Sequence, residues 1–341
     1  MRRLNEQNER LKRDYLGYLK DAEGYDEATR DKVAASLLMF EEALGFKAFK
    51  VFHRDWAATF KSHLEARKSQ RTGKPLGLST RDGILRDVKG FFHWLASQPG
   101  FKSRLTYHDV RYFNNNAKDA RAAHAQRPKR YPSLAQCAHA FRLMPQETVV
   151  DRRNRAMFAL WVMTGARAGA LASLRVQHVD LIEGVVYQDG REVRTKGAKS
   201  FETWFFPVDA VYREAFEAWF TELTERHLFG PGDALFPKQK VGTWGGSFAA
   251  IGLDPEPYAN AQKVREVIGG AFSAAGLHPF NPHSIRTTLA MLGDKLCPNM
   301  EARKAWSQNL GHESLATTVS AYTPVGRERQ GELIKGLGRC P

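Results

Sequence analysis

Cysteine is scarce in this chain, and its scarcity excludes whole classes of protein. Only Cys137, Cys297 and Cys340 occur among 341 residues, an odd number with no paired spacing. A disulfide framework needs an even set of cysteines, and a structural zinc site needs closely spaced Cys or His pairs. We therefore expect neither, and we expect these thiols to be reduced and structural or incidental.

Long apolar runs and acidic charge are also in short supply. The longest apolar stretch, residues 156–163, is far shorter than a membrane span of ~20 residues, and Met1 precedes charged residues rather than a signal-type segment. Asp and Glu number 37 against 51 Lys and Arg, a net charge of +14 that favours a polyanionic partner. Nucleic acid is the leading candidate and an anionic membrane surface the second. We expect a soluble, intracellular protein with no membrane partner.

Two signatures of nucleotide and metal chemistry are missing as well. The sequence has no Gly-rich phosphate loop that ends in Lys-Ser or Lys-Thr, and no Asp/Glu cluster spaced to hold magnesium. The first absence argues against ATP use, and the second against a two-metal nuclease or transposase. The sequence therefore predicts an activity without cofactor or metal.

The apolar pattern that is present is mainly helical. In residues 80–96, apolar side chains such as Val88 and Phe91 fall on one face, whereas Arg86 and Lys89 fall on the other. This spacing predicts an amphipathic helix with a cationic outer stripe. Similar patterns predict helices over residues 28–44 and 54–67.

A shift in composition predicts two domains. Residues 118–131 are polar, basic and proline-bearing, which is typical of a linker. We predict an all-helical, DNA-binding domain over residues 1–117 and a second, mixed domain over 132–341. In the second domain we expect helices over 151–163, 168–174, 210–227, 260–275, 284–296, 301–310 and 314–321.

A small antiparallel sheet is expected within the second domain. Residues 185–187, 192–195 and 203–208 have β-type composition, and turn residues separate them. Lys196 and Lys199 fall in the second turn. The fold class is therefore mainly α with a small antiparallel β-sheet.

Five polar residues of the second domain suit an attack on a phosphodiester without metal: Arg167, His283, Arg286, His312 and Tyr322. A phosphodiester gains charge on its non-bridging oxygens as a nucleophile attacks, and bidentate arginines stabilise that charge. Arg167 and Arg286 would supply these forks. Taken singly, each residue has a structural reading, such as a surface arginine, a cap histidine or a half-buried tyrosine.

Proton transfers decide the remaining roles. Tyrosine has a reference pKa of about 10, so Tyr322 needs a proton acceptor before it can displace a 5′ oxygen. His283 is our candidate acceptor, and His312 is a donor to the phosphate. The departing 5′ alkoxide needs a proton, which a lysine on a turn can deliver. Lys196 is our choice, with Lys199 as the alternative.

The order of these residues resembles the tyrosine recombinase family, also called the phage integrases. The family's Thr-Gly-x-Arg box matches Thr164–Leu171, and its hairpin lysine matches Lys196. Its His-x-x-Arg box matches His283 with Arg286, and its Leu-Gly-His box, followed by a tyrosine, matches 310–312 and Tyr322. The resemblance is strong over residues 132–325 and weaker over the first domain.

The resemblance implies a site-specific recombinase or integrase that forms a covalent 3′-phosphotyrosine. The new bond replaces a phosphodiester of similar energy, so rejoining needs no ATP. Family members act in DNA recombination, often for a mobile genetic element. The resemblance also implies double-stranded DNA as the partner and a cytoplasmic protein that is nucleoid-associated when bound to DNA. It further implies a tetramer on two DNA sites, a monomer in isolation, and room for an accessory directionality protein.

Two departures from the family pattern leave alternatives open. The family often has an acidic residue where Ala170 stands, and a basic one where Thr287 stands. A catalytically weak or silent DNA-binding protein of the same fold is therefore one alternative. A type IB topoisomerase-like strand relaxation, which shares the covalent chemistry, is the other.

Basic residues outside the boxes are candidates for phosphate contacts. The loop of residues 68–74 reads either as a solvated loop or as a DNA contact, and the net charge favours contact. The apolar residues of the tail at 327–341 predict a helix that packs on its own domain or, as in the resembled family, on a neighbouring protomer. The predicted DNA contacts are Arg71, Lys74, Arg86, Lys89, Lys129, Arg130 and Lys199.

Overall fold

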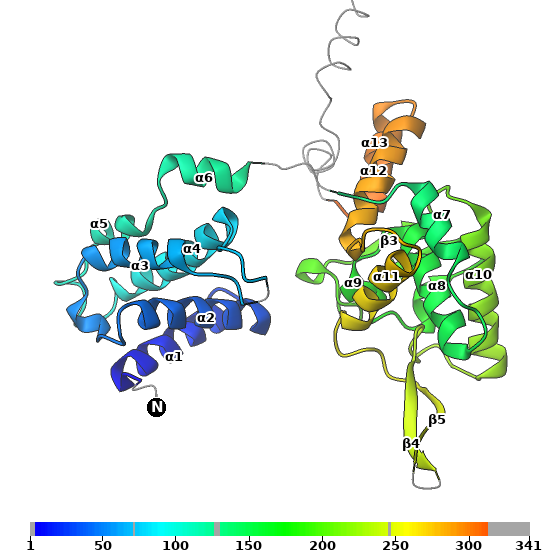
Figure 1. Ribbon diagram of the computed structural model, residues 1–341, viewed down its shortest axis with the longest axis horizontal. Coiled ribbons are helices and arrows are strands. Elements are labelled where there is room, and N and C mark those ends of the chain that lie inside the picture. The colour runs from blue at the N-terminus through cyan, green and yellow to red at the C-terminus, as the bar shows by residue number, and fades with distance from the viewer. Residues whose placement is uncertain (1–3, 71, 126–129, 245–246, 313–341) are drawn as a thin grey trace, which may run out of the picture. The chain divides into compact units, whose positions relative to one another are not determined.

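The computed structural model describes residues 4–70, 72–125, 130–244 and 247–312, without the side chains of 124 and 243–250. The chain divides into two units, Met1–Arg127 and Pro128–Pro341 (Figure 1). We describe each unit by itself.

The described part of the first unit is entirely helical, as the sequence predicts. Asn5, Asp26 and Asn116 begin three of its helices by accepting hydrogen bonds from backbone N–H groups of the first turn. The predicted linker range, 118–131, begins inside the last of these helices. The elements are α1 (Glu6–Asp21), α2 (Glu27–Ala43), η1 (Phe49–Val51), α3 (Asp55–Ala66), α4 (Leu78–Leu95), α5 (Tyr107–Val110), η2 (Arg111–Phe113) and α6 (Ala117–His124).

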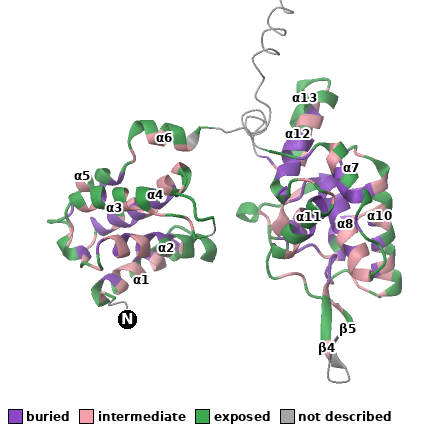
Figure 2. Ribbon diagram, viewed as in Figure 1, coloured by how far each residue is buried: buried purple, intermediate pink, exposed green. Residues whose placement is uncertain are grey.

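Aromatic rings fill the core of the first unit. Phe40 of α2 is fully buried and lies edge-to-face against Phe60 and Phe92, with ring centroids 5.1 Å apart in both pairs. Helix α4 buries Val88 and leaves Arg86 exposed, which confirms its predicted amphipathic pattern (Figure 2). Burying each such large side chain stabilises the unit by about 1.5–3 kcal/mol.

The second unit combines helices with two small antiparallel sheets, so the predicted fold class is confirmed. The predicted helix at 210–227 is α-helical up to Thr221 and continues as a π-helix. The elements are α7 (Leu134–Arg142), α8 (Val149–Thr164), α9 (Ala168–Leu171), η3 (Val176–His178), β1 (Val179–Asp180), β2 (Val185–Gln188), η4 (Lys196–Ala198), β3 (Phe201–Trp204), α10 (Ala210–Thr221), η5 (Glu222–Arg226), β4 (Lys238–Trp244), β5 (Ser247–Asp254), α11 (Gln262–Ala274), η6 (Pro282–Ser284), α12 (Ile285–Leu296) and α13 (Met300–Asn309).

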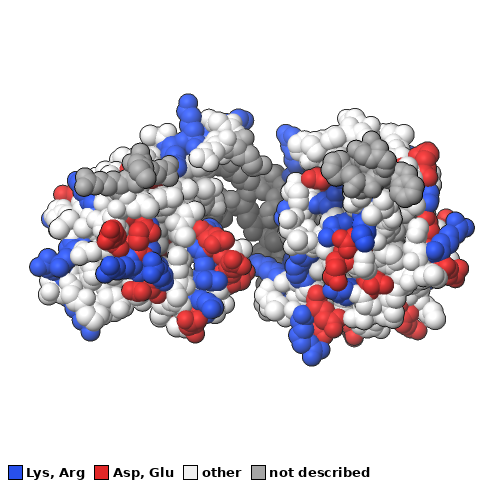
Figure 3. Space-filling view, turned by 90° about the horizontal axis from the view of Figure 1, so that it is seen from below, with Lys and Arg blue, Asp and Glu red and all other residues white. Residues whose placement is uncertain are grey.

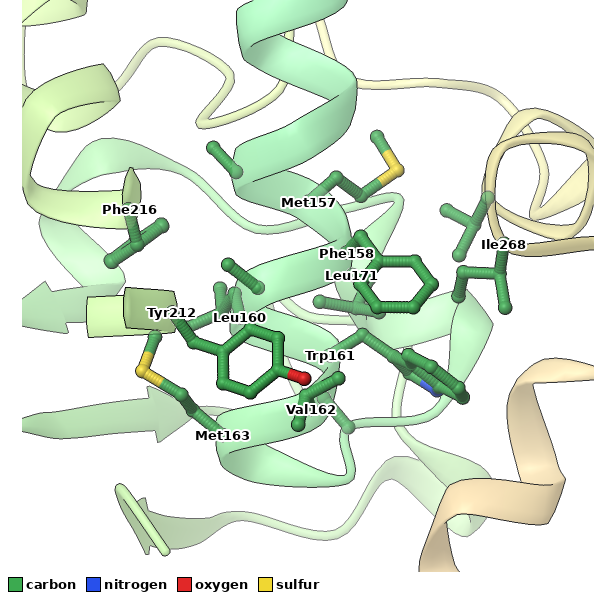
Figure 4. Packing of buried hydrophobic residues seen from close by; sticks show 14 of the residues in the cluster. Met157, Phe158, Leu160, Trp161, Val162, Met163, Leu171, Tyr212, Phe216 and Ile268 are labelled. Atoms are coloured by element: carbon green, nitrogen blue, oxygen red, sulfur yellow. The ribbon is translucent and has the colours of Figure 1, made fainter. Parts of the chain in front are cut away.

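Helix α8 is the centre of this unit. Every residue from Ala156 to Thr164 is buried, so this half of the helix is surrounded on all sides by the rest of the unit. Figure 4 shows Phe158 and Trp161 on the side of α8 towards Ile268 of α11, and Tyr212 of α10 beside the helix. A rigid, fully packed helix therefore leads directly to the Thr-Gly-x-Arg box.

The sheet corrects one sequence prediction. The three-stranded sheet has the order β1-β2-β3, with Val179 opposite Val186 and Val186 opposite Thr203. Residues 192–195, predicted as a strand, form no strand. The carbonyl of Asp189 accepts hydrogen bonds from the N–H groups of Glu192 and Val193, so the chain turns back at once.

A second sheet, the hairpin of β4 and β5, was not predicted. It extends away from the body of the unit (Figure 1), and Val241 and Ile251 on it are exposed. The sequences of the two strands do not alternate between apolar and polar residues, which is the pattern that predicts a half-buried strand pair. Among the helices of the described residues, none has both the length and the apolar composition that crossing a membrane requires.

Candidate active site

The Thr-Gly-x-Arg box is a helix end that the sequence specifies locally. Gly165 ends α8 with φ of +60°, and its N–H donates to the carbonyl of Trp161 at 2.9 Å. A Cβ at this position would lie 2.9 Å from Leu289, so only glycine fits. Arg167 then occupies the N-cap position of α9 and is half-buried. The break between the helices predicted over 151–163 and 168–174 therefore falls at Gly165, and Arg167 begins the second helix.

Arg286 ties the other boxes to this helix end. It lies in the first turn of α12 and is only 2% exposed. Its guanidinium donates to the carbonyl of Gly165 at 3.1 Å and to the carbonyl of Leu310, and it lies 2.8 Å from Nε2 of His312. A buried charge is costly unless polar partners surround it, so these contacts hold the fork in one orientation.

His312 is buried against the two arginines. Burial, and then the charges of Arg286, Arg167 and His283, lower the pKa of its imidazole to about 4. The imidazole is therefore neutral near pH 7. A guanidinium has only donors, so Nε2 of His312 accepts from Arg286 and Nδ1 carries the proton.

His283 approaches the same cluster from a short 3₁₀ turn. Asn281 caps this turn by accepting from the N–H of His283 at 3.0 Å, and Trp161 of α8 donates to the carbonyl of Pro282 at 2.7 Å. The imidazole of His283 is exposed. It lines a hollow of about 290 Å³ together with Arg130. The structure thus brings Arg167, His283, Arg286 and His312 into one cationic cluster.

Lys196 and Lys199 lie on the exposed turn that joins β2 to β3. Gly197 and Ala198 in this turn both have positive φ, at +71° and +51°. The N–H of Arg194, just before the turn, donates to Oγ of Ser173 at 2.9 Å, and Ser173 closely follows α9. The segment that leads into the lysine turn is therefore attached to the helix that Arg167 begins.

The two departures from the resembled pattern lie inside the unit. Ala170 is 1% exposed, and its carbonyl accepts from the N–H and the hydroxyl of Ser173. Thr287 is 6% exposed on α12. Both positions hold side chains without charge in places where a charge would be buried.

Three predicted site residues, Tyr322, Arg71 and Lys129, lie outside the described residues. Of the other predicted DNA contacts, Lys74, Arg86, Arg130 and Lys199 are exposed and Lys89 is half-buried. Figure 3 shows Lys and Arg interspersed with Asp and Glu over the visible face of each unit. Within the described residues, no group of three or more His, Cys, Asp or Glu is arranged to hold a metal ion.

An apolar groove that sequence analysis missed lies apart from the cationic cluster. It has a volume of about 1070 Å³ and runs between β3 and the α12–α13 pair. Trp204, Leu296 and Trp306 line it, and Trp204 is 50% exposed. Aromatic residues on a strand are normally core, so composition alone gives no signal for such a groove.

Comparison with known proteins reproduces the extent of the resemblance. The sequence model described as the phage integrase family matches residues 132–329. A tyrosine recombinase XerC of Lactobacillus delbrueckii subsp. bulgaricus is 24% identical over 324 residues, which are 93% of this chain and 95% of that protein. The XerC of Stutzerimonas stutzeri is 28% identical over 239 residues, covering 69% of this chain and 66% of that one.

Solved structures share the fold. A lambda integrase dimer bound to a COC′ core site superposes with a TM-score of 0.59 and 17% identity, over 95% of this chain and 77% of that one. The XerH site-specific recombinase bound to difH substrate superposes with a TM-score of 0.55 and 18% identity, over 95% of this chain and 83% of that one.

Proposed function

Because the chain belongs to the phage integrase family, whose members transfer DNA strands, we propose that it is a site-specific tyrosine recombinase that works through a covalent 3′-phosphotyrosine. The observation that carries the proposal is the cluster at the end of α8. Two guanidiniums and two imidazoles from three separate segments converge there, and one guanidinium, that of Arg286, is almost completely buried.

The arginines bind the scissile phosphate. Arg286 donates to the carbonyls of Gly165 and Leu310 and lies against His312, so its guanidinium is held in one orientation before an anion binds. Arg167 stands at the N-cap position of α9 and is half-buried. Such preorganised donors stabilise the extra negative charge of the transition state and contribute about 3–4 kcal/mol each.

Tyr322 is the proposed nucleophile. Its oxygen attacks phosphorus, the bond from phosphorus to the 5′ oxygen breaks, and the tyrosine becomes esterified to the 3′ end. His283 is exposed at the edge of the cluster and accepts the phenol proton. His312 is neutral and donates from Nδ1 to a phosphate oxygen, because its Nε2 faces Arg286.

Lys196 is the proposed general acid. An alkoxide is a poor leaving group, so the 5′ oxygen departs with a proton from the Lys196 ammonium. Lys199, three residues later, is the alternative donor on the same exposed turn. Attack by another 5′ hydroxyl on the phosphotyrosine reverses each transfer and joins a new strand. The two ester bonds have similar energy, so the reaction uses no ATP, and the arginines and Lys196 supply the charge stabilisation and the proton that a metal site would otherwise provide.

The first unit is the proposed second half of a DNA clamp. Lys74, Arg86 and Lys89 would contact phosphates from the helical unit, and Arg130 from the catalytic one. Both lambda integrase and XerH were solved on DNA, which supports this partner. Four protomers on two sites would exchange strands, whereas the free protein would be a monomer. An accessory protein would set the direction.

The tail at 327–341 is proposed to dock on a neighbouring protomer in that assembly. Its apolar residues Leu333, Ile334 and Leu337 fall at helical spacing. The apolar groove beside α13 is a suitable acceptor, because both its walls and the tail would gain by excluding water.

A nicked suicide substrate tests the proposal. The nick lets the short 5′ fragment diffuse away after cleavage, so an active enzyme accumulates as a covalent DNA adduct that survives denaturation. We expect adduct with the parent protein and none with Tyr322→Phe, which should still bind the same DNA. Adduct in the phenylalanine variant would show that another nucleophile operates.

A catalytically silent DNA-binding protein is the second candidate. The uncharged Ala170 and Thr287 favour it, because the resembled pattern often has charges there. Binding of target DNA with no adduct on the nicked substrate, for the parent protein as well, would select this alternative.

A further inference from the structure

The connection from β2 to β3, residues 189–200, is long for a turn between paired strands, and it is folded back on the unit. Its two ends are adjacent, since Gln188 lies opposite Phe201 in the sheet. Between them, the chain contacts residues 177–178, Ser173 and residues 258–259, and it also packs against itself. The residues that make these contacts lie on both sides of Lys196 in the sequence, and the contacts do not involve the Lys196 side chain.

The first contact joins Glu192 to the buried His178. His178 is 4% exposed, and its Nδ1 accepts from the N–H of Arg175 at 2.9 Å. Its proton is therefore on Nε2, which donates to Glu192 at 2.9 Å. Gln177 donates to the same carboxylate oxygen at 2.8 Å. The hydrogen bond from His178, and then that from Gln177, lower the pKa of the Glu192 carboxyl.

The second contact joins Arg194 to the start of α9 and to residues 258–259. Its N–H donates to Ser173, and its guanidinium donates to the carbonyls of Tyr258 and Ala259. A Cβ atom placed on Gly169 of α9 would lie 3.1 Å from the carbonyl oxygen of Arg194. The backbone two residues before Lys196 thus packs on α9, only two residues beyond Arg167.

The third contact seats the lysine turn itself. A Cβ on Gly190 would lie 2.0 Å from the carbonyl oxygen of Ala198, so the turn rests directly on the glycine backbone. The N–H of Gly190 also donates to Oγ of Ser200 at 2.9 Å. Any side chain at position 190 must displace the turn.

We propose that Glu192, held by His178, and Gly190 are positioning residues that fix the Lys196 turn on α9, and so deliver the general acid to the phosphate that Arg167 binds. The inference rests on the proposed function, because it takes Lys196 as the proton donor. These residues touch neither DNA nor the reacting atoms. They act by increasing the population of one conformation of the exposed turn that contains Lys196 and Gly197.

The role can be separated from folding and from phosphate binding. The Glu192 side chain is 49% exposed, so water can replace its hydrogen bonds when the carboxylate is removed. Loss of the carboxylate should therefore leave the unit folded. The defect should appear only where a proton must reach the leaving group.

A change of leaving group tests this. In a nicked substrate with sulfur at the 5′ bridging position, the bond from phosphorus to sulfur breaks and a thiolate leaves. Thiols have pKa values near 8.5, so this group departs without a general acid. Cleavage of the oxygen and the sulfur substrate is compared for the parent, Lys196→Ala, Glu192→Ala, Glu192→Gln and Gly190→Ala. Glu183→Ala, which removes an exposed carboxylate from the turn between β1 and β2, is the matched control.

We expect Glu192→Ala and Gly190→Ala to cleave the oxygen substrate about 10- to 100-fold more slowly than the parent. Both should cleave the sulfur substrate within about twofold of it. Glu192→Gln, which can still accept from His178, should retain most of the activity, and Glu183→Ala all of it. Thermal unfolding and DNA binding should be unchanged in Glu192→Ala.

The outcomes separate the two proposals. Sulfur rescue of Lys196→Ala without rescue of Glu192→Ala and Gly190→Ala would overturn the positioning role alone. Failure of sulfur to rescue Lys196→Ala would overturn the assignment of Lys196 as general acid, and the positioning role with it.

Discussion

The two units place their positive charge differently. Among the described residues of the first unit, no Lys or Arg is buried, and the core is a cluster of rings around Phe40. The second unit buries Arg153 and Arg286, each at 2% exposure. Both units have ample apolar cores, so the buried cations of the second unit are not a consequence of poor packing.

Buried polar groups also serve different ends in the two units. In the first, the buried carboxylate of Glu41 bonds to Lys12 and to Asn8, whose N–H group lies 2.9 Å away, so charge is neutralised and α1 is fixed to α2. In the second, Arg286 is held by carbonyls and by His312. The first arrangement stabilises a fold, and we propose that the second orients a charge for a phosphate. On this proposal, exposed basic residues serve DNA binding and the buried Arg286 serves the chemistry.

The largest expected effect is that of an Arg→Lys substitution in the second unit, with the same substitution in the first unit as its control. Arg286→Lys keeps the charge but loses the fork that bonds to Gly165 and Leu310. We expect adduct formation to fall about 10²- to 10³-fold, while DNA affinity changes little. Arg86→Lys, on the exposed face of α4, should alter neither. Rates on the nicked substrate and a binding titration measure both.

A proportional loss of binding and cleavage in Arg286→Lys would contradict this contrast. It would mean that Arg286 is an ordinary phosphate contact, no different in kind from the basic residues of the first unit.

The features predicted correctly from sequence are those with local causes. The helix predicted over 151–163 ends where it does because Gly165 tolerates a positive φ. The amphipathic pattern of α4 likewise depends only on residues three and four apart. Four of the predicted site residues do meet in space, although no local rule brings Arg167 to His312. The order of family motifs supplied that information.

The features missed from sequence depend on contacts between distant segments. Residues 192–195 have β-type composition, but Glu192 bonds to His178 and Arg194 to Ser173, and these contacts outweigh strand propensity. The apolar groove likewise exists because α13 packs beside β3, where Asn309 bonds to the backbone of Trp204. A short window of sequence predicts neither the contacts of residues 192–195 with His178 and Ser173 nor the packing of α13 on β3.

A second test uses the pH dependence of stability. The folded pKa of His312, about 4, lies below its ordinary value of 6.5, because burial and then the charge of Arg286 disfavour protonation. Between these values the unfolded chain binds a proton that the folded one does not. The free energy of unfolding of the second unit should therefore fall as pH decreases from 6.5 to 4, and should not depend on this group above 6.5.

Denaturant titrations of the parent and of His312→Gln at pH 7 and pH 5 measure this effect. The variant should lose less stability on acidification than the parent does. The first unit contains no residue of this cluster, so its own transition should respond identically in both proteins. Equal acid sensitivity of the second unit in both proteins would indicate that His312 is protonated in the folded state.

The smallest expected effect lies on the surface of the first unit. Lys89→Ala removes a half-buried ammonium on α4 that we assign to a DNA phosphate. The slope of log affinity against log salt should decrease by about one, with the cleavage rate of bound complexes unchanged. Arg286→Lys should show the opposite pattern, with the parent salt slope and slow cleavage. If Lys89→Ala instead slowed cleavage at saturating DNA, the first unit would take part in chemistry, and the division between surface charge for binding and buried charge for catalysis would fail.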